Sequence, residues 1–235
     1  MQDNSKRSLL VTAFVALLFG FGGAALWSVT GLGHSQTRDY LLENPELLPQ
    51  MAENLQRKEA SARLVGVADQ VVAPFPGAVL GNPEGTVTLV EFTDYGCSFC
   101  RLSREPIEAL IAKNPDLRVV IREWPIFEGS DKAASMALAA AQQGKFAEFH
   151  AAMFDQSSRS EDGILAAAAI AELDLAKAEQ FIEAGGPDYE LSKNTGLARQ
   201  LGFGGTPSWV VGDQAFEGAV GEEALQAAID AARES

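Results

Sequence analysis

Two cysteines, Cys97 and Cys100, restrict the fold and chemistry of this 235-residue chain more than any other feature. They are the only cysteines in the sequence, and they follow a β-branched run, Val87–Tyr95. A helical stretch from the cysteines to about Lys113 and a second strand pattern, Leu117–Trp124, come next. This order predicts a β-α-β unit with a CxxC pair where the first strand meets the helix.

The predicted position of the pair favours redox chemistry. The first turn of a helix stabilises negative charge, because its backbone N–H groups are free and the helix dipole is positive there. We therefore expect the pKa of Cys97 to lie below that of a free thiol. Cys100, one turn later, can attack a mixed disulfide at Cys97, so that the pair carries two electrons as a disulfide or a dithiol.

Three other interpretations of the pair stay open. A zinc site needs two further ligands, and the sequence has only His34, close to an apolar segment, and His150, which we expect to pack in the core. A copper(I) site is an alternative, because soft metals bind paired thiolates. A structural disulfide across so short a loop would add little stability. A solitary CxxC pair favours redox activity, with no metal and no cofactor beyond Cys97 and Cys100.

The rest of the chain predicts helices followed by a strand pair. Residues 131 to about 201 are rich in Ala, Leu, Glu and Gln and predict four or five short helices without a convincing strand. Strand patterns return at Ser208–Gly212 and Gln214–Gly218. An amphipathic helix is expected from about Glu222 to Arg233.

The N-terminal segment predicts export. Leu9–Trp27 is nearly all apolar, and its nineteen residues would span roughly 28 Å as a helix, close to the thickness of a bilayer core. Lys6 and Arg7 precede this run and indicate a cytoplasmic tail, residues 1–7. Residues 8–30 therefore predict a transmembrane anchor.

A cleaved signal peptide is the alternative for the same segment. Gly23, Ala24 and Ala25 offer the small residues that a peptidase requires. Either form would export the body of the protein. The net charge of −14, from 32 acidic and 18 basic residues, suits such a body and disfavours binding to nucleic-acid phosphates.

Residues 31–75 predict a helical stalk. Asn44 and Pro45 are expected to start a helix within the charged segment 36–62. Apolar residues recur there at heptad spacing: Leu41, Leu48, Met51 and Leu55. The pattern fits either a solvated spacer helix or a stalk that forms a homo-oligomer. The turn-forming residues 74–85 then predict a domain boundary.

Four segments resemble the bacterial DsbA-type thiol-disulfide oxidoreductases, in particular the ScsC-like branch: GNPEGTVTLVEFTDYGCSFCR, REWPIF, KFAEFHAAMF and GTPSWVVG. The resemblance covers roughly residues 76–235. It implies an α/β, thioredoxin-like fold with a helical insertion at about 131–205. It also implies a periplasmic enzyme, anchored in the inner membrane or soluble after signal cleavage. Such an enzyme acts on cysteine-containing exported proteins and is reset by a redox partner.

The resemblance assigns roles to individual residues. Cys97 matches the exposed nucleophile and Cys100 the resolving thiol. Thr206 and Pro207 match a Thr and cis-proline that face the active site and pair with the substrate backbone. Glu91 matches a buried acid that assists proton transfer, and its place in the apolar run LVEF predicts a raised pKa. The alternative for Glu91 is an outward-facing position on an edge strand.

Ser98 and Phe99 separate the cysteines, where the family frequently has Pro or Gly directly after the nucleophile. These two positions tune the redox potential in the family, so oxidase, isomerase and reductase directions stay open. Phe99 is expected either to pack inside or to rim a hydrophobic peptide-binding surface. Two non-redox alternatives remain: a thiol-based copper-binding protein, and a binding or assembly module on a thioredoxin scaffold.

Overall fold

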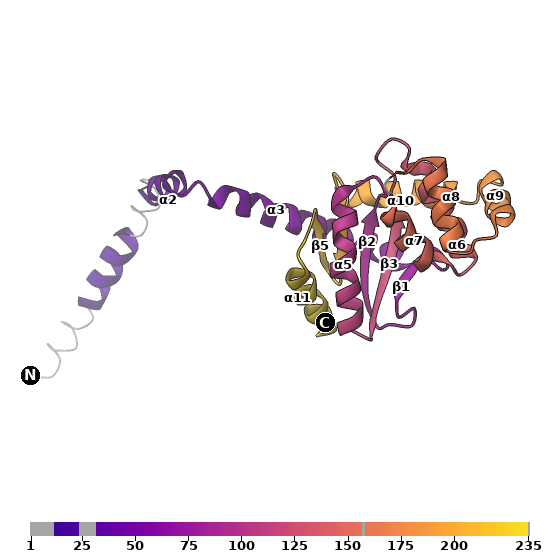
Figure 1. The fold of residues 1–235 in the computed structure, drawn as a ribbon. Helices are drawn as coiled ribbons and strands as arrows, with labels where there is room; N and C mark the ends of the chain where they lie inside the picture. The colour runs from indigo at the N-terminus through magenta and orange to yellow at the C-terminus, as the bar shows by residue number, and fades with distance from the viewer. Residues whose placement is uncertain (1–11, 24–31, 157, 235) are drawn as a thin grey trace, which may run out of the picture. The chain divides into compact units, whose positions relative to one another are not determined.

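The computed structural model describes residues 12–23, 32–156 and 158–234. The chain divides into two compact units, Met1–Leu55 and Gln56–Ser235. Figure 1 shows the helical character of the first unit and the mixed sheet of the second.

The first unit is helical over most of its described part. A helix over residues 12–23 is followed by α2 (Leu32–Glu43) and by the first turns of α3 (Leu47–Leu64). Among the described residues, no helix combines the length and apolar character that a membrane crossing requires. The predicted anchor or signal peptide, residues 8–30, lies in part outside the described residues, and both alternatives stay predictions.

The stalk region contains two helices with a break at Asn44. The Asn44 side chain donates to the Tyr40 carbonyl at 2.7 Å, so it closes α2. The sequence had predicted instead that Asn44 starts the next helix. Pro49 lies in the first turn of α3, where its missing N–H costs no helical hydrogen bond. Three of the four heptad residues are more than half exposed in the single chain: Leu48 (58%), Met51 (51%) and Leu55 (58%).

The second unit is built on a five-stranded sheet in the order β1-β3-β2-β4-β5. Strands β2 and β3 are parallel, and the other three pairings are antiparallel. The strands are β1 (Val79–Gly81), β2 (Val87–Thr93), β3 (Leu117–Glu123), β4 (Ser208–Val211) and β5 (Gln214–Glu217). Both parallel strands are buried at six of their seven positions, as expected for strands covered on both faces of the sheet.

Helices cover both faces of the sheet. On one face, Leu89 of β2 shares a core with Ile107 of α5 (Ser98–Lys113) and with residues of α11 (Glu222–Arg233). On the other face, Phe92 of β2 shares a second core with Leu64 of α3. Alternate residues of the central strand therefore belong to different cores, as strand geometry requires.

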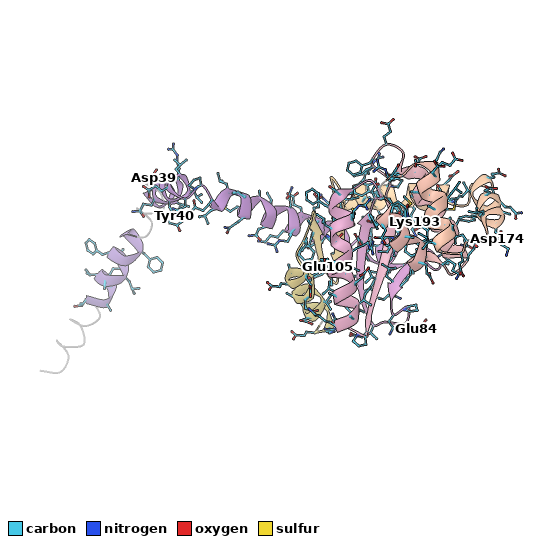
Figure 2. The ribbon with its side chains drawn as sticks, in the orientation of Figure 1. Asp39, Tyr40, Glu84, Glu105, Asp174 and Lys193 are labelled. Atoms are coloured by element: carbon cyan, nitrogen blue, oxygen red, sulfur yellow. The ribbon has the colours of Figure 1, made fainter. Side chains whose placement is uncertain are left out.

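Helix α5 completes the predicted β-α-β unit, since it joins the parallel strands β2 and β3. Its inward stripe has helical spacing: Cys100, Ser103, Ile107 and Leu110. Glu105 lies on the exposed side of the same helix (Figure 2). Burial of this stripe fixes the rotation of α5, so Cys100 must face the core.

The predicted helical insertion is confirmed. Between β3 and β4 the described residues form five helices and no strand: α6 (Ser130–Gln142), α7 (Phe146–Asp155), α8 (Glu161–Ile170), α9 (Leu175–Glu183) and α10 (Asp188–Leu201). Ala residues dominate the buried side of α6, which lets neighbouring helices approach it closely.

A buried arginine ties the insertion and the preceding linker to the sheet. Arg122 of β3 is only 1% exposed, a position that a guanidinium tolerates only when its donors are satisfied. Its partners are the carbonyls of Gln70, Val71 and Ala73 and the side chains of Glu190 and Asn194. Arg122 thus holds α4 (Ala68–Val72) and α10 against β3.

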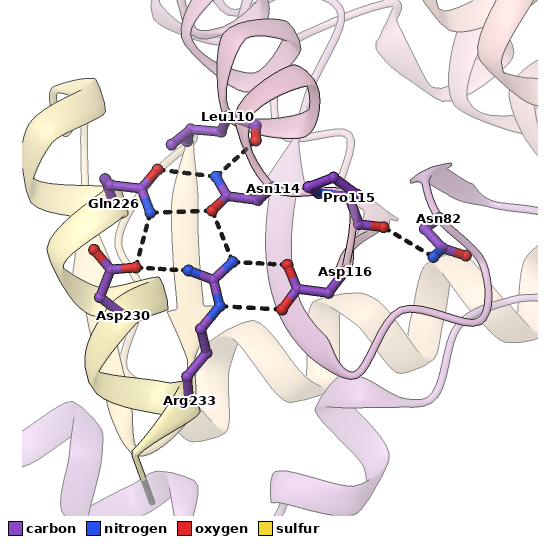
Figure 3. Close-up of polar contacts among 8 residues, drawn as sticks. All are labelled: Asn82, Leu110, Asn114, Pro115, Asp116, Gln226, Asp230 and Arg233. Carbon is purple, nitrogen blue, oxygen red and sulfur yellow. Dashed lines mark hydrogen bonds and ion pairs between the residues drawn. The ribbon is translucent and has the colours of Figure 1, made fainter.

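The C-terminal helix is fastened by a second polar cluster (Figure 3). Arg233 of α11 donates to both carboxylate oxygens of Asp116, at 3.0 and 2.7 Å, and to Oδ1 of Asn114 at 2.7 Å. Asn114 also donates to Oε1 of Gln226 at 2.9 Å. These contacts hold the end of α11 against the turn between α5 and β3.

Two elements were not predicted. Strand β1 lies inside residues 74–85, which the sequence analysis assigned to a boundary, and it pairs antiparallel with β3. The short helix α4 lies within the predicted stalk, yet Val71 belongs to the core beneath the sheet. Strand β1 forms because β3 offers it hydrogen-bond partners, and α4 forms because Val71 packs in the core that contains Phe92 and Leu64. Local sequence patterns reveal neither of these partners.

Candidate functional site

The two thiols lie at the start of α5. Cys97 is the N-cap residue, and its Sγ accepts a hydrogen bond from the backbone N–H of Cys100 at 3.4 Å. Both cysteines are free and buried, with 4% of Cys97 and 1% of Cys100 exposed. The expectation of an exposed nucleophile is therefore wrong for the unbound chain, because neighbouring groups such as the Thr206 carbonyl cover Cys97.

The environment separates the acidities of the two thiols. The hydrogen bond from the Cys100 thiol lowers the pKa of Cys97 to about 6, and the backbone N–H groups of Cys100 and Phe99 act in the same direction. Burial, the Cys97 thiol and the Glu91 carboxyl all raise the pKa of Cys100. Near neutral pH, Cys97 is the thiolate and Cys100 keeps its proton.

Glu91 lies on the buried side of Cys100. It is in the central strand β2 and only 4% exposed, so the outward-facing alternative is wrong. Burial raises its pKa to about 8, although Ser103 Oγ donates to Oε1 at 3.3 Å and opposes the shift. A carboxyl group of this acidity can exchange a proton near neutral pH.

Thr206 lies beside Cys97, and Pro207 follows it. The Thr206–Pro207 bond is cis. The Thr206 carbonyl oxygen lies 3.1 Å from Cys97 Sγ and accepts a hydrogen bond from it when Cys97 is protonated. The Thr206 hydroxyl is buried, and the Thr206 side chain helps to lower the pKa of Cys97.

Apolar side chains surround the covered thiol. Phe99 is 56% exposed, so the packing alternative for this residue is wrong. Ile126 and Phe127 are also exposed, and Phe127 lies so close to Gly96 that a side chain at Gly96 would collide with it. Together they form an apolar rim, defined as Phe99, Ile126 and Phe127.

Asp94 joins this rim to the cysteine turn, a role that the sequence analysis missed. Its Oδ1 accepts from the Gly96 N–H at 2.6 Å, and its Oδ2 accepts from the N–H groups of Ile126 at 2.6 Å and Phe127 at 2.9 Å. The motif DYGCSFC contains this aspartate, but only the folded chain brings the second loop to it.

A buried polar chain and a cavity lie behind the thiols. The Tyr95 hydroxyl oxygen lies 2.8 Å from Oε1 of Glu123 and 3.0 Å from Nδ1 of His150, within hydrogen-bond distance of both. A cavity of about 220 Å³ is lined by His150 together with Glu91 and Cys100. His150 packs in the core as predicted, whereas Tyr95 and Glu123 were not predicted as site residues.

The described residues hold no group of three or more His, Cys, Asp or Glu side chains arranged for a metal ion. The side chain of His34 lies outside the part of the chain whose side chains are described. A copper(I) site would rest on the two thiols alone. The prediction that no cofactor is needed stays a prediction.

Comparison with known proteins assigns the family. The family model described as "Thioredoxin" matches residues 76–231, and the one described as "Copper resistance protein ScsC N-terminal domain" matches residues 37–62. The first match covers more than half of the chain, which therefore belongs to the thioredoxin family.

Solved structures narrow this class. A thioredoxin-like oxidoreductase from Silicibacter pomeroyi DSS-3 is 45% identical, with 67% of this chain and 92% of that chain covered and a TM-score of 0.64. A linker-deletion mutant of Proteus mirabilis ScsC is 25% identical, with 86% and 93% covered and a TM-score of 0.63. The thiol-disulfide exchange protein alpha-DsbA2 from Wolbachia pipientis is 26% identical, with 77% and 97% covered and a TM-score of 0.67.

These matches define the class as thioredoxin-fold proteins, and two of these neighbours are named as an oxidoreductase and a thiol-disulfide exchange protein. Within that class the chain is a DsbA-family, ScsC-like protein, as the sequence motifs had indicated.

Curated relatives include Na(+)/H(+) antiporters named NhaA. One from Salinispora tropica is 28% identical over 170 residues, which is 70% of this chain and 26% of that protein. One from Salinispora arenicola is 26% identical, with 79% of this chain and 30% of that protein covered. The chain thus spans less than a third of the length of these relatives.

Proposed function

We propose that this chain exchanges disulfides with the cysteines of exported proteins, with Cys97 as nucleophile and Cys100 as resolving thiol. The observation that carries the proposal is the divided acidity of one CxxC pair at a helix start. The pKa of Cys97 is about 6, whereas that of its buried neighbour Cys100 is raised. Such a pair presents one reactive thiolate and one protonated thiol in reserve.

The exchange proceeds in two steps. The Cys97 thiolate attacks a substrate disulfide, forms a mixed disulfide and releases one substrate thiolate. Cys100 then attacks Sγ of Cys97, which releases the second substrate thiolate and leaves the Cys97–Cys100 disulfide. The Cys100 proton passes to the Glu91 carboxylate. The substrate gains the two electrons that the pair loses, and the reverse sequence oxidises a substrate dithiol.

The surroundings of Cys97 suit an extended peptide with apolar side chains beside its cysteine. The apolar rim offers hydrophobic contact area next to the thiol. Thr206 and Pro207 lie against the thiol on the other loop and are proposed to pair with the substrate backbone. A substrate that docks there must displace the Thr206 carbonyl from Cys97.

The cellular setting is part of the proposal. The predicted N-terminal segment supports export to the periplasm, with inner-membrane anchoring or signal cleavage as alternatives. A periplasmic or membrane redox partner would reset the pair. The match of residues 37–62 to the ScsC N-terminal domain and the exposed heptad residues support a stalk that forms a homo-oligomer.

The mechanism is tested with two single substitutions in the full chain. Cys97→Ala should abolish exchange with a disulfide-bonded protein substrate, because the thiolate is lost. Cys100→Ala should accumulate mixed disulfides, visible as reducible adducts on non-reducing gels. Ser98→Ala, an exposed position between the thiols, is the matched control and should retain exchange. Retained exchange by Cys97→Ala would show that the proposed function is wrong.

The direction of disulfide exchange is tested by measuring the reduction potential of the Cys97–Cys100 pair against a glutathione buffer. A potential near about −120 mV would indicate an oxidant, and one near about −270 mV a reductant. An intermediate value would be compatible with isomerase activity.

A further inference from the structure

Three buried side chains behind the thiols form a continuous hydrogen-bonded chain. Tyr95 precedes the CxxC pair, Glu123 ends β3 and His150 lies in α7. The Tyr95 oxygen is 2.8 Å from Oε1 of Glu123 and 3.0 Å from Nδ1 of His150. All three residues are less than 5% exposed: Tyr95 at 3%, Glu123 at 0% and His150 at 4%. The exchange between the two thiols does not use them.

This series of hydrogen bonds ends at His150, which lines a cavity that reaches the resolving thiol, Cys100. The same cavity of about 220 Å³ is lined by His150, Glu91 and Cys100. The rest of its lining comes from β1, α5 and α7 and includes Leu80 and Arg104. His150 therefore shares one space with the two groups that exchange the resolving proton.

The hydrogen-bonded chain has two arrangements, which differ in the place of one proton. With a proton on Glu123, Oε1–H donates to the Tyr95 oxygen, the Tyr95 hydroxyl donates to Nδ1 of His150, and the ring carries its hydrogen on Nε2. Without that proton, Tyr95 donates to the carboxylate, Nδ1–H donates to Tyr95, and Nε2 is an acceptor. Both distances suit either arrangement.

We propose that Glu123, Tyr95 and His150 form a proton relay that serves Cys100 through this cavity, in parallel with Glu91. The proposal rests on the proposed function, because it concerns the proton that Cys100 gains or loses during exchange. None of the three residues touches a reacting sulfur atom, so they are positioning residues that act through the cavity.

The relay transfers one proton when the Cys97–Cys100 disulfide opens and returns it when the disulfide forms. When a substrate thiolate opens the Cys97–Cys100 disulfide, Cys100 leaves as a thiolate. A proton moves from Glu123 to the Tyr95 oxygen, and the Tyr95 proton moves to Nδ1 of His150. Water in the cavity takes the Nε2 proton and gives a proton to Cys100. Tyr95 and His150 end neutral, and Glu123 ends as a carboxylate. Formation of the disulfide reverses each transfer.

The electrostatic surroundings favour a neutral acid and a neutral ring at rest. Burial raises the pKa of Glu123 well above its usual range, and the nearby carboxyl groups of Asp94 and Glu91 add to this shift. Burial, aided by the Arg104 guanidinium, lowers the pKa of His150 to about 3. The proton therefore passes by a change of ring tautomer, without an imidazolium intermediate.

The test separates the two thiol steps in the full chain. Reduced protein reacts with a nitrobenzoate disulfide, and stopped-flow absorbance records two releases of coloured thiolate. The first release reports attack by Cys97, and the second reports resolution by Cys100. We expect the rate of the second phase to rise with pH through two ionisations, because Glu91 and Glu123 can accept the Cys100 proton only as carboxylates. Glu91→Gln should remove the one near pH 8, and Tyr95→Phe and Glu123→Gln should each remove the other.

A packing control distinguishes a relay from a structural effect. Phe154 lies 4.8 Å from Tyr95 between ring centroids but carries no exchangeable proton, so Phe154→Leu loosens the same cluster and should keep both ionisations. An unchanged second phase in Tyr95→Phe would overturn the relay, and so would loss of the same ionisation in Phe154→Leu. Absence of the first phase in the wild-type chain would instead contradict the proposed function.

Discussion

At the residue scale, the acidity of Cys97 depends on its partner Cys100. The hydrogen bond from the Cys100 thiol is the largest cause of the lowered pKa of Cys97. The backbone N–H groups at the start of α5 contribute less, although the sequence had predicted the shift from them alone. The motif therefore identifies the reactive thiol, whereas the folded pair determines how reactive it is.

This dependence predicts the effect of removing the resolving thiol. In the wild-type chain, the rate of Cys97 alkylation by iodoacetamide should rise with pH through an inflection at about 6, because only the thiolate reacts. In Cys100→Ala the inflection should move upward, towards the ordinary pKa of a thiol. Leu102→Ala, at an exposed position of α5 outside the cysteine pair, should keep the wild-type inflection. An inflection that does not move in Cys100→Ala would assign the shift to the helix start alone.

Residues close in sequence to the thiols were the easier part of the site to predict. Cys97, Cys100 and Glu91 belong to one continuous motif. Tyr95, Glu123 and His150 meet only because β3 and α7 pack behind the cysteine turn, with sequence separations of 28 and 55 residues from Tyr95. Amino-acid composition and hydrophobic periodicity predict helices and strands, but they do not predict contacts between residues so far apart in the sequence.

At the element scale, Arg122 holds α4 and α10 against the sheet through its buried hydrogen bonds. Arg122→Ala should lower the free energy of unfolding by about 3–5 kcal/mol. It leaves the buried Glu190 carboxylate with only Lys193, at 3.5 Å, and it removes the donor from the carbonyls of Gln70, Val71 and Ala73. Urea denaturation of the full chain measures this loss.

A second arginine of β3 supplies the control. Arg118 is half-buried, and its side chain donates to Thr88 Oγ1 at 3.2 and 2.8 Å, with no buried carboxylate paired to it in the described part of the chain. Arg118→Ala should therefore cost about 1 kcal/mol. Equal losses from the two substitutions would contradict the clamping role of Arg122.

Long elements were predicted better than short ones. Helix α11 has the predicted bounds, and the parallel strands differ from prediction by one or two residues at an end. Strand β1 has three residues beside Gly and Pro, so its sequence is indistinguishable from a turn, and only pairing with β3 makes it a strand. Asn44 suits either end of a helix, and the carbonyl of Tyr40 decides which one it caps.

At the scale of the whole molecule, the exposed heptad predicts self-association of the stalk. Leu48→Glu combined with Leu55→Glu should convert an oligomer of the full chain to monomers, because charges would replace the apolar seam. Sedimentation velocity measures the change. Leu42→Glu, at an exposed apolar position outside the heptad, should leave the oligomer intact. A wild-type chain that sediments as a monomer would contradict the proposed stalk.

The three carboxylate contacts of Asp94 have a consequence for redesign and for evolution. One side chain fixes both the turn that bears the nucleophile and the loop that bears Ile126 and Phe127. We therefore expect the proposed substrate preference and the reactivity of Cys97 to change together. A change in the Ile126–Phe127 loop that allows a new substrate to bind would also shift the turn that carries Cys97. Compensating substitutions near Asp94 are then expected wherever substrate preference changes.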